Sequence, residues 1–241
     1  MDVSPANAAT IDSYDSFTDE ELAAWDPAGD VGRRLLLNPT IFRMLGDIAG
    51  AHILDAGCGQ GYLSRLMAAR GARVVGVEPA ARLTAYARQR EAERNQGAVF
   101  FERDLSRLGD VGGPFDAVVA NMVLLDIADW RAAMRNCVEA LRPGGTFVYS
   151  LLHPCWPPEA TESWAARRCV EIQEYLSEYT VTAKHGTNFH RPVSAYLNET
   201  IASGCSIVEV AEPAADAEEV PAGAEILVHV PNYIVISATR G

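Results

Sequence analysis

The residues with the clearest chemistry form a glycine-rich turn after a short apolar segment. The segment ends at Asp55, and Gly57, Gly59 and Gly61 then alternate with other residues until a helical pattern begins at Tyr62. Glycine is required where a backbone turns tightly or touches a ligand, because a Cβ would collide there. The first turn of a helix also offers free backbone N–H groups. The turn is therefore predicted to bind a small ligand.

Polar residues also follow three later apolar segments. Glu78 lies about 20 residues beyond the turn, where an acid can accept both hydroxyls of a ribose. Asp104, followed by Leu105, is placed to accept a hydrogen bond from an adenine amino group. Asn121 and Met122 follow the fourth segment, at the point where open α/β sheets bind ligands.

Two ligand classes suit the glycine turn. A dinucleotide fingerprint needs G-x-G-x-x-G, whereas this sequence has G-x-G-x-G with Tyr62 at the position of the last glycine. A bulky tyrosine opposes the close helix–strand packing of that fingerprint, and Asp55 suits a ligand amino group better than a diphosphate. The turn therefore favours a ligand with an amino group, and an NAD-dependent oxidoreductase remains the alternative.

The elements that must position these groups alternate between strand and helix patterns. The strand patterns are apolar without alternation, as is typical of strands covered on both faces. This order predicts a doubly wound α/β fold with a mostly parallel sheet. The strand predictions are 73–77, 98–102, 115–120 and 146–151, and the helix predictions are 80–94 and an amphipathic segment from 130 that stops at Pro143.

A single domain of 241 residues is predicted, against a prior of roughly 150 residues per domain. Its parts are an N-terminal arm with helices (1–50), a ligand-binding core (51–151), an aromatic lid insertion (152–192) and a closing part (193–241). The closing part should contain a helix over 193–203 and an antiparallel strand pair over 206–210 and 233–239.

The motifs resemble those of the class I S-adenosylmethionine-dependent methyltransferases. In chain order they are ILDAGCGQG, VVGVEP, ERDL, FDAVVANMVLLDI and LRPGG, between Ile53 and Ser150. The resemblance implies a seven-stranded Rossmann-like fold and S-adenosyl-L-methionine as cofactor. It implies that the methionine end is held by Asp55, Gly57 and Gly59, the ribose by Glu78, the adenine by Asp104 and the Leu105 backbone, and the amino group by the carbonyl of Asn121, with Met122 beside it.

Tyr14 in the N-terminal arm is a further candidate cofactor contact. It could close over the cofactor carboxylate, or it could be an aromatic anchor of the arm.

Charge and cysteine content exclude several classes. The formal net charge is −12, which opposes association with DNA or RNA. Five cysteines without a C-x-x-C pair indicate reduced thiols, and no spacing of His and Cys fits a metal site. The sequence has no signal-peptide pattern and no apolar run long enough to span a membrane. A cytoplasmic monomer or homodimer is expected.

Small molecules remain as the class of methyl acceptor. The stretches 153–156 and 188–194 resemble parts of small-molecule methyltransferases of bacterial specialised metabolism, which includes antibiotic biosynthesis. His153 and His190 are candidate general bases, and Arg191 is a candidate grip for an acceptor carboxylate or phosphate. Trp156 would belong to an aromatic acceptor pocket. The alternatives are structural roles for all four residues, and a protein that binds the cofactor without turnover.

Overall fold

A seven-stranded sheet forms the centre of the molecule. The computed structural model describes residues 2–24 and 27–241. The strand order is β3-β2-β1-β4-β5-β9-β8, in which β9 runs antiparallel to the other six strands. The strands are β1 (His52–Ala56), β2 (Arg73–Val77), β3 (Val99–Phe101), β4 (Phe115–Asn121), β5 (Leu141–Leu152), β8 (Cys205–Ala211) and β9 (Tyr233–Arg240). The predicted mostly parallel seven-stranded sheet with an antiparallel closing pair is confirmed.

The chain reverses its direction of travel across the sheet at β1. It runs outward from β1 to β2 and β3, and then returns to place β4 on the other side of β1. Loops that leave the carboxyl ends of β1 and β4 therefore diverge, and ligands of open α/β sheets bind in the crevice between them. The glycine turn follows β1, and Asn121 ends β4.

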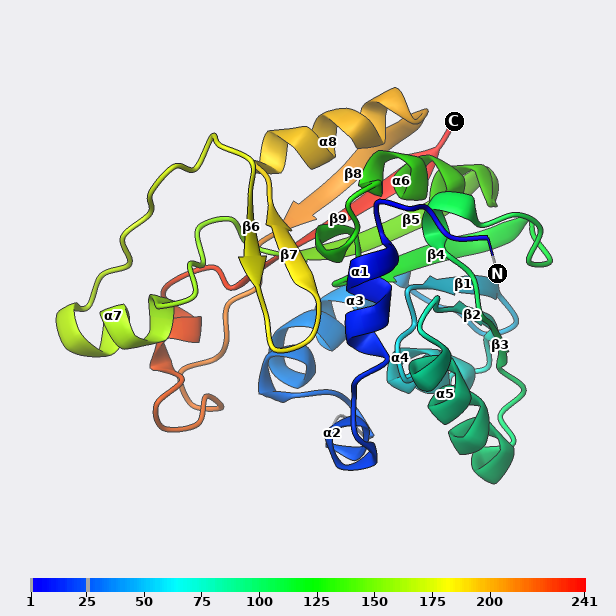
Figure 1. Cartoon of the computed structure of the whole chain (residues 1–241), viewed down its shortest axis with the longest axis horizontal. Coiled ribbons are helices and arrows are strands. Elements are labelled where there is room, and N and C mark those ends of the chain that lie inside the picture. The colour runs from blue at the N-terminus through cyan, green and yellow to red at the C-terminus, as the bar shows by residue number, and fades with distance from the viewer. Residues whose placement is uncertain (1, 25–26) are drawn as a thin grey trace.

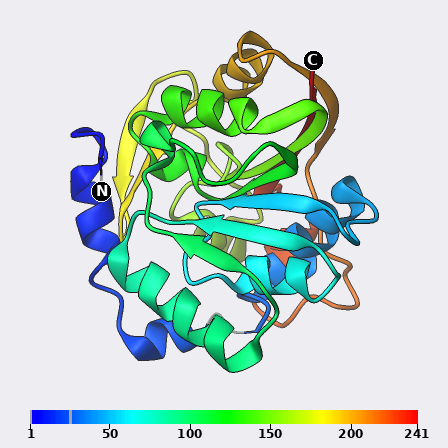
Figure 2. The ribbon, with the colours of Figure 1, turned by 90° about the vertical axis from the view of Figure 1, so that its right-hand side faces the viewer.

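Helices cover both faces of this sheet, so that its central strands are buried (Figure 1). Figure 2 shows the resulting layers from the side. On one face, Trp130, Met134 and Tyr196 pack in a cluster with the sheet. They come from α6 (Trp130–Glu139) and α8 (Val193–Ala202). The other face carries η1 (Arg33–Leu37), α3 (Asn38–Leu45), α4 (Tyr62–Ala68) and α5 (Ala81–Arg94).

Two segments far apart in the chain lie side by side at the carboxyl edge of the sheet (Figures 1 and 2). The first is the N-terminal arm, with α1 (Ala8–Tyr14) and α2 (Asp19–Ala23). The second is a hairpin of β6 (Tyr179–Thr182) and β7 (Thr187–His190), which forms a separate sheet inside the predicted lid insertion. The insertion also contains α7 (Ala160–Arg167).

The structure differs from the sequence prediction at the end of α6. The helix ends at Glu139, and β5 already begins at Leu141, so the segment Pro143–Gly145 lies inside the strand instead of ending the helix. The pairing of β4 with β5 shifts in register between Phe115 and Ala117, which accommodates this irregular start.

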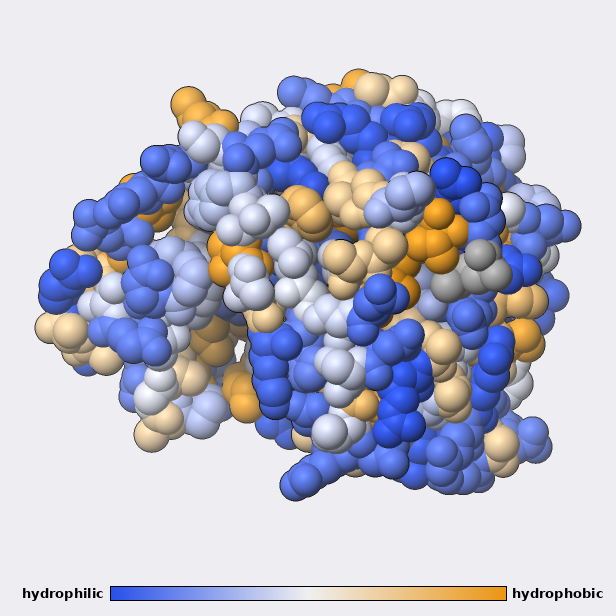
Figure 3. Space-filling view, in the orientation of Figure 1, coloured by the Kyte–Doolittle hydropathy of each residue, from blue (hydrophilic) through white to orange (hydrophobic). Residues whose placement is uncertain are grey.

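The surface that bears the arm and the hairpin is predominantly hydrophilic, with apolar residues in small scattered groups (Figure 3). Among the described residues, no helix combines the length and apolar character needed to cross a membrane.

Candidate functional site

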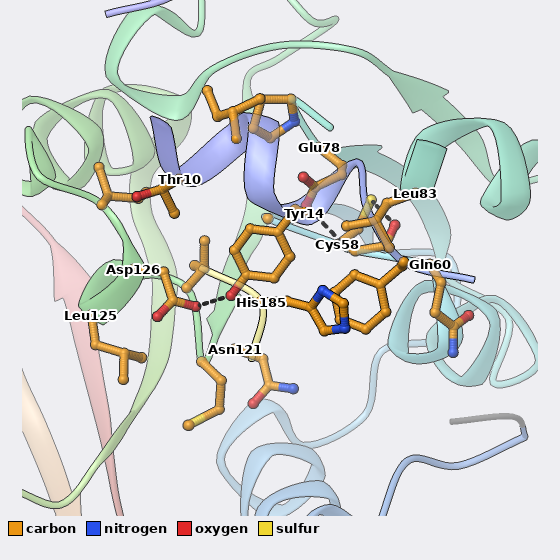
Figure 4. Close-up of a pocket in the computed structure, with 18 of the residues that line it drawn as sticks. Thr10, Tyr14, Cys58, Gln60, Glu78, Leu83, Asn121, Leu125, Asp126 and His185 are labelled. Atoms are coloured by element: carbon orange, nitrogen blue, oxygen red, sulfur yellow. Dashed lines mark hydrogen bonds between the residues drawn. The ribbon is translucent and has the colours of Figure 1, made fainter. Parts of the chain in front are cut away.

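A cavity of about 560 Å³ lies at the carboxyl edge of β1, β2 and β4. This volume is within the range of small-molecule sites. Its floor includes Asp55, the glycine turn and Glu78, and its roof comes from α1 and from the loop between β6 and β7 (Figure 4). The cavity therefore occupies the crevice at which the chain reverses direction across the sheet.

The glycine turn needs glycine for two different reasons. Gly57 has φ +73°, and a Cβ built on it would lie 2.3 Å from Cγ2 of Val123, which is far too close. Gly59 has φ +54°, and a Cβ there would meet no atom within 4 Å, although Gly59 lines the cavity. The first glycine lets the loop after β1 approach the loop after β4, and the second leaves space beside the backbone for a ligand.

Asp55 lies at the end of β1 with 1% of its surface exposed, and it lines the cavity. One oxygen of its carboxylate accepts a hydrogen bond from Oγ of Ser64. Burial raises the pKa of Asp55 to about 6, although the bonds from Ser64 and the charge of Arg65 act in the opposite direction. Asp55 therefore places a negative charge beside the glycine turn near neutral pH.

Glu78 follows β2 and connects it to the glycine turn. Its carboxylate accepts hydrogen bonds from the backbone N–H groups of Gly59, at 3.1 Å, and Ala80, at 2.9 Å. Burial raises the pKa of Glu78 to about 7 in spite of these two bonds. Each oxygen still has an unused lone pair, so the carboxylate can accept further bonds from a ligand.

Asp104 lies in the cavity wall, but its carboxylate is already bound by the N-terminal arm. It accepts hydrogen bonds from the backbone N–H of Ser4 at 2.8 Å and from Nδ2 of Asn7 at 3.1 Å. It also accepts one from the backbone N–H of Ser106. Leu105, which is 1% exposed, follows it in the wall. Asp104 therefore anchors the arm at this end of the cavity.

Asn121 and Met122 form the end of β4 in the cavity wall. The Asn121 amide donates to the hydroxyl of Tyr62 at 2.9 Å and accepts from Oγ of Ser150 at 2.7 Å. Met122 has φ +57°, a left-handed conformation that costs a non-glycine residue about 1–3 kcal/mol. The side chain of Asn121 is thus held by the protein, and the strained Met122 turns the chain towards the next loop.

Tyr14 reaches from α1 into the cavity, where it meets an acid that sequence analysis gave no role. Its hydroxyl donates to Oδ2 of Asp126 at 2.6 Å, and the other carboxylate oxygen accepts from Nδ2 of Asn188 in β7 (Figure 4). Burial and the charge of Asp126 raise the pKa of Tyr14, so its hydroxyl keeps its proton. Burial raises the pKa of Asp126 to about 6.

The arm and the hairpin also contact each other directly over the cavity. The ring of His185 stacks on Phe17 with 3.8 Å between centroids, and its two nitrogens lie at hydrogen-bond distance from Ser16 and Glu21. Lys184 forms an ion pair with the same Glu21. These contacts make one roof from two segments of the chain.

His153 does not line the cavity. It follows β5 and is 5% exposed, with Nε2 2.8 Å from Oε1 of Glu212 and Nδ1 accepting from the backbone N–H of Cys155 at 3.0 Å. Both ring nitrogens are therefore engaged by the protein. This geometry fits the structural alternative for His153, in which its ring holds the end of β5 through hydrogen bonds.

The other three lid candidates also lie outside the cavity lining. His190 contacts the carbonyl of Tyr175 and stacks on Tyr179. Arg191 is 4% exposed, and its guanidinium donates to the carbonyl oxygen of Ile127. Trp156 packs against the apolar cluster beneath α3 and α4. This arrangement does not support binding of an acceptor anion by Arg191, because the guanidinium is buried among protein groups.

Several polar residues of the cavity were missed by sequence analysis, among them Asn7, Asp126 and Asn188. Asp126 had a recognisable signal, since it is an acid inside the apolar run Met122–Ile127 directly after a strand. Asn7 and Asn188 had none, because their roles depend on contacts with residues about a hundred and about sixty positions away.

Comparisons with known proteins identify the family of the chain. A family model described as a methyltransferase domain matches residues 53–145. The chain is 32% identical, over 134 residues, to a protein of Alkalilimnicola ehrlichii named ubiquinone biosynthesis O-methyltransferase. That match covers 54% of this chain and 54% of the relative, so the chain spans only about half the length of that curated relative.

Solved structures resemble the chain over most of its length. The crystal structure of an S-adenosylmethionine-dependent methyltransferase from Mesorhizobium loti is 30% identical, with a TM-score of 0.72, and the match covers 84% of this chain and 96% of the other. The 1,6-didemethyltoxoflavin-N1-methyltransferase of Burkholderia thailandensis, at 17% identity and a TM-score of 0.66 over 100% and 92% of the two chains, shares the fold. The chain therefore belongs to the S-adenosylmethionine-dependent methyltransferases, and S-adenosylmethionine is its cofactor.

Proposed function

We propose that the protein transfers a methyl group from S-adenosylmethionine to an oxygen or nitrogen atom of a small-molecule acceptor, an intermediate of bacterial natural-product or antibiotic biosynthesis. The observation that carries this proposal is the single cavity wall that combines the glycine turn, Asp55 and Glu78 at the carboxyl edge of the sheet. The relatives named above act in methyl transfer, and the name of one of them specifies oxygen. Because the match with this relative covers only about half of each chain, its acceptor is not transferred to this protein, and the proposed acceptor class depends on the cavity.

The residues of the cavity fit the cofactor. The open space beside Gly59 is the space that a Cβ would fill, and Asp55 and Glu78 line the same cavity. A carboxylate at Asp55 suits an amino group, and the lone pairs of Glu78 suit two ribose hydroxyls. Leu105 supplies an apolar surface for a flat base, whereas the Asp104 carboxylate is engaged by Ser4 and Asn7 of the arm.

When bound, the cofactor supplies a methyl group made electrophilic by a positively charged sulfur. The chain must hold the acceptor in line, exclude water and receive a proton where the acceptor has one to lose. The roof of arm and hairpin is the part of the chain that would exclude water. Tyr14 contributes to this roof and to the position of Asp126, while His153 and His190 lie outside the cavity lining.

The proposal extends to the partners of the protein and to its location in the cell. A net charge of −12 favours small-molecule acceptors over nucleic acids. We further propose a cytoplasmic enzyme, monomeric or homodimeric, in which the whole chain forms one methyltransferase domain.

The test is to incubate the protein with methyl-labelled S-adenosylmethionine and a cell extract that has been separated into small-molecule, nucleic-acid and protein fractions. Label in the small-molecule fraction, suppressed by added S-adenosylhomocysteine, is the expected result. Label in a polymer fraction would contradict the acceptor class.

A cofactor-binding protein without turnover is the rival outcome. In that case calorimetry would detect the cofactor, and no fraction would acquire label. The NAD-dependent alternative loses its basis, because the chain belongs to the methyltransferases and Tyr62 is a packed residue, 5% exposed, at the third glycine position of the dinucleotide pattern.

A further inference from the structure

Asp126 is an acid of the cavity for which the family resemblance gave no role. It ends η3 (Leu124–Asp126), directly beyond the strained turn at Met122. Its carboxylate holds both parts of the roof, because Tyr14 of the arm and Asn188 of the hairpin each donate to a different oxygen. A half-buried carboxylate that lines a cavity and is oriented from two sides is a prepared hydrogen-bond acceptor.

The loop that carries Asp126 is fixed against the glycine turn. Val123, in the same loop, lies so close to Gly57 that no side chain fits between them. In Figure 4, Asp126 lies on one side of the cavity and Cys58 and Gln60 of the glycine turn lie on the other, with Tyr14 between them. A molecule beside the glycine turn therefore shares one cavity with Asp126 and with the Tyr14 ring that lies between them.

We propose that Asp126 accepts the proton of the acceptor's O–H or N–H group, and that the site takes neutral or cationic acceptors and disfavours anionic ones. This inference rests on the proposed function and names the acceptor class and the base of the same site. Tyr14 and Asn188 are positioning residues for the carboxylate.

The proton balance of this step is simple. The acceptor oxygen or nitrogen gives an electron pair to the methyl carbon, whose bond to sulfur breaks with its electron pair left on sulfur, and the proton passes to Asp126. A carboxylate has about four lone pairs, of which Tyr14 and Asn188 use two. Lone pairs therefore remain for the acceptor while the carboxylate stays oriented.

The charge of the cavity argues for the acceptor class. Among the described residues, the lining contains two cations, and both are paired with acids: Arg33 with Asp30 and Lys184 with Glu21. An anionic acceptor would face uncompensated like charge in a partly dry site, which is unfavourable. The lining acids outnumber the cations by three, and they are Glu21, Asp55, Glu78, Asp104 and Asp126.

The protonation of Asp126 is suited to this role. Burial raises its pKa to about 6, so the carboxylate is ionised at neutral pH but binds a proton more strongly than an exposed acid does. A base must be deprotonated to work, so the rate should rise with pH through about 6. The charged and polar groups that face it are Tyr14 of α1, Asn188 of β7, Arg33 of η1, Arg191 after β7 and Glu78 after β2.

The first experiment compares Asp126→Asn with Asp110→Asn, an exposed acid in the loop before β4 at the opposite edge of the sheet. Asp126→Asn should lower methyl transfer into the small-molecule fraction by about 10²- to 10⁴-fold and should remove the rise of the rate near pH 6. Affinity for S-adenosylhomocysteine, measured by calorimetry, should stay within about threefold, and Asp110→Asn should match the wild type.

The second experiment measures acceptor charge without turnover. Tyramine, tyrosol and 4-hydroxyphenylacetate present the same phenol with a positive, a neutral and a negative side chain. Their binding to the protein loaded with S-adenosylhomocysteine is followed by ligand-observed NMR. The anion should bind at least about tenfold more weakly than tyrosol. Asp126→Asn should reduce this gap, whereas Asp110→Asn should leave it unchanged.

The outcomes separate this inference from the proposed function. Methyl transfer that survives in Asp126→Asn at more than a tenth of the wild-type rate would overturn the base and leave the methyltransferase intact. Equal binding of the three phenols, or binding by none of them, would overturn the charge selectivity. Absence of label with the wild-type protein would instead contradict the proposed function, while the NMR comparison would still decide the charge selectivity.

Discussion

The two walls of the cavity are constructed in different ways. The floor is made by strand ends, and its acids are held within it: Glu78 accepts from the backbone of Gly59 and Ala80, and Asp55 accepts from Ser64. The roof is made by contacts between distant segments: the Tyr14 hydroxyl donates to Asp126, and the backbone N–H of Gly186 donates to Oγ of Ser13. The fold therefore determines the floor, whereas the roof exists only when the arm and the hairpin meet. We expect damage to the floor to be larger than damage to the roof.

The largest effect should follow substitution of the glycine that joins the two loops of the floor. Gly57→Ala adds a Cβ that overlaps Val123, and it forces alanine into a left-handed backbone. The two penalties together should lower the free energy of unfolding by about 2–5 kcal/mol. Thermal and denaturant unfolding measure this loss, and calorimetry should show that cofactor binding is abolished.

Gly50→Ala is the matched control for this substitution. Gly50 has nearly the same φ, +75°, but a Cβ there meets no atom within 4 Å. It should cost only the backbone strain, about 1–2 kcal/mol, and leave cofactor affinity unchanged. Equal losses in the two variants would mean that contact between the glycine turn and Val123 contributes nothing.

The next effect concerns the acid that links the glycine turn to β2. Glu78→Gln should weaken cofactor binding by about 1–3 kcal/mol, the cost of losing a charge-assisted hydrogen bond. The pKa of Glu78 is raised to about 7, and hydroxyl donors prefer the ionised carboxylate. Wild-type affinity should therefore be full above pH 7 and fall as the pH is lowered through it.

Calorimetry between pH 6 and pH 8 checks both statements about Glu78. The variant should show a flatter dependence on pH, because its amide does not titrate in this range. An unchanged affinity at pH 8 would remove Glu78 from the ribose site.

The difference between floor and roof also explains how much the sequence predicts. Asp55, Glu78 and Asn121 are found from the sequence because each stands at the carboxyl end of a strand or directly after it, and parallel strands bring those positions to one edge. The prediction of His153 and His190 as bases rests on their residue type and on the stretches of sequence in which they lie. Residue type does not say which way a side chain points, and both rings are engaged by protein groups outside the cavity.

The same limit applies to Asp104 and to the roof. The sequence places Asp104 correctly after β3, but it gives no sign that Ser4 and Asn7 bind its carboxylate. Local patterns carry information about spacing within an element, whereas contacts between residues a hundred positions apart depend on the whole fold. The charge of the chain, by contrast, needs no contact information, and it predicts that acidic polymers are disfavoured as partners.

A smaller effect should follow from opening the roof without changing the floor. His185→Ala removes the ring that stacks on Phe17 and contacts Glu21, a loss of about 1 kcal/mol. We expect the dissociation rate of S-adenosylhomocysteine to rise about fivefold, as measured by stopped flow, and hydrogen exchange to increase over residues 13–17.

His229→Ala is the control, because His229 also stacks on an aromatic ring, that of Trp164, but away from the cavity lining. It should leave the dissociation rate unchanged. Should both variants release the ligand equally fast, the arm and the hairpin would not act as a roof.

The smallest effect on turnover should come from the histidine that the sequence favoured most. In the structure, Nδ1 of His153 accepts from Cys155, so its proton must be on Nε2, which lies against Glu212. A base needs a free nitrogen lone pair directed at the acceptor, and this ring has none. His153→Gln should therefore keep methyl transfer within about twofold of the wild type, while Asp126→Asn does not. If His153→Gln instead lowered turnover a hundredfold with unchanged cofactor affinity, the reacting atoms would lie beyond β5, and the roof would have to rearrange to reach them.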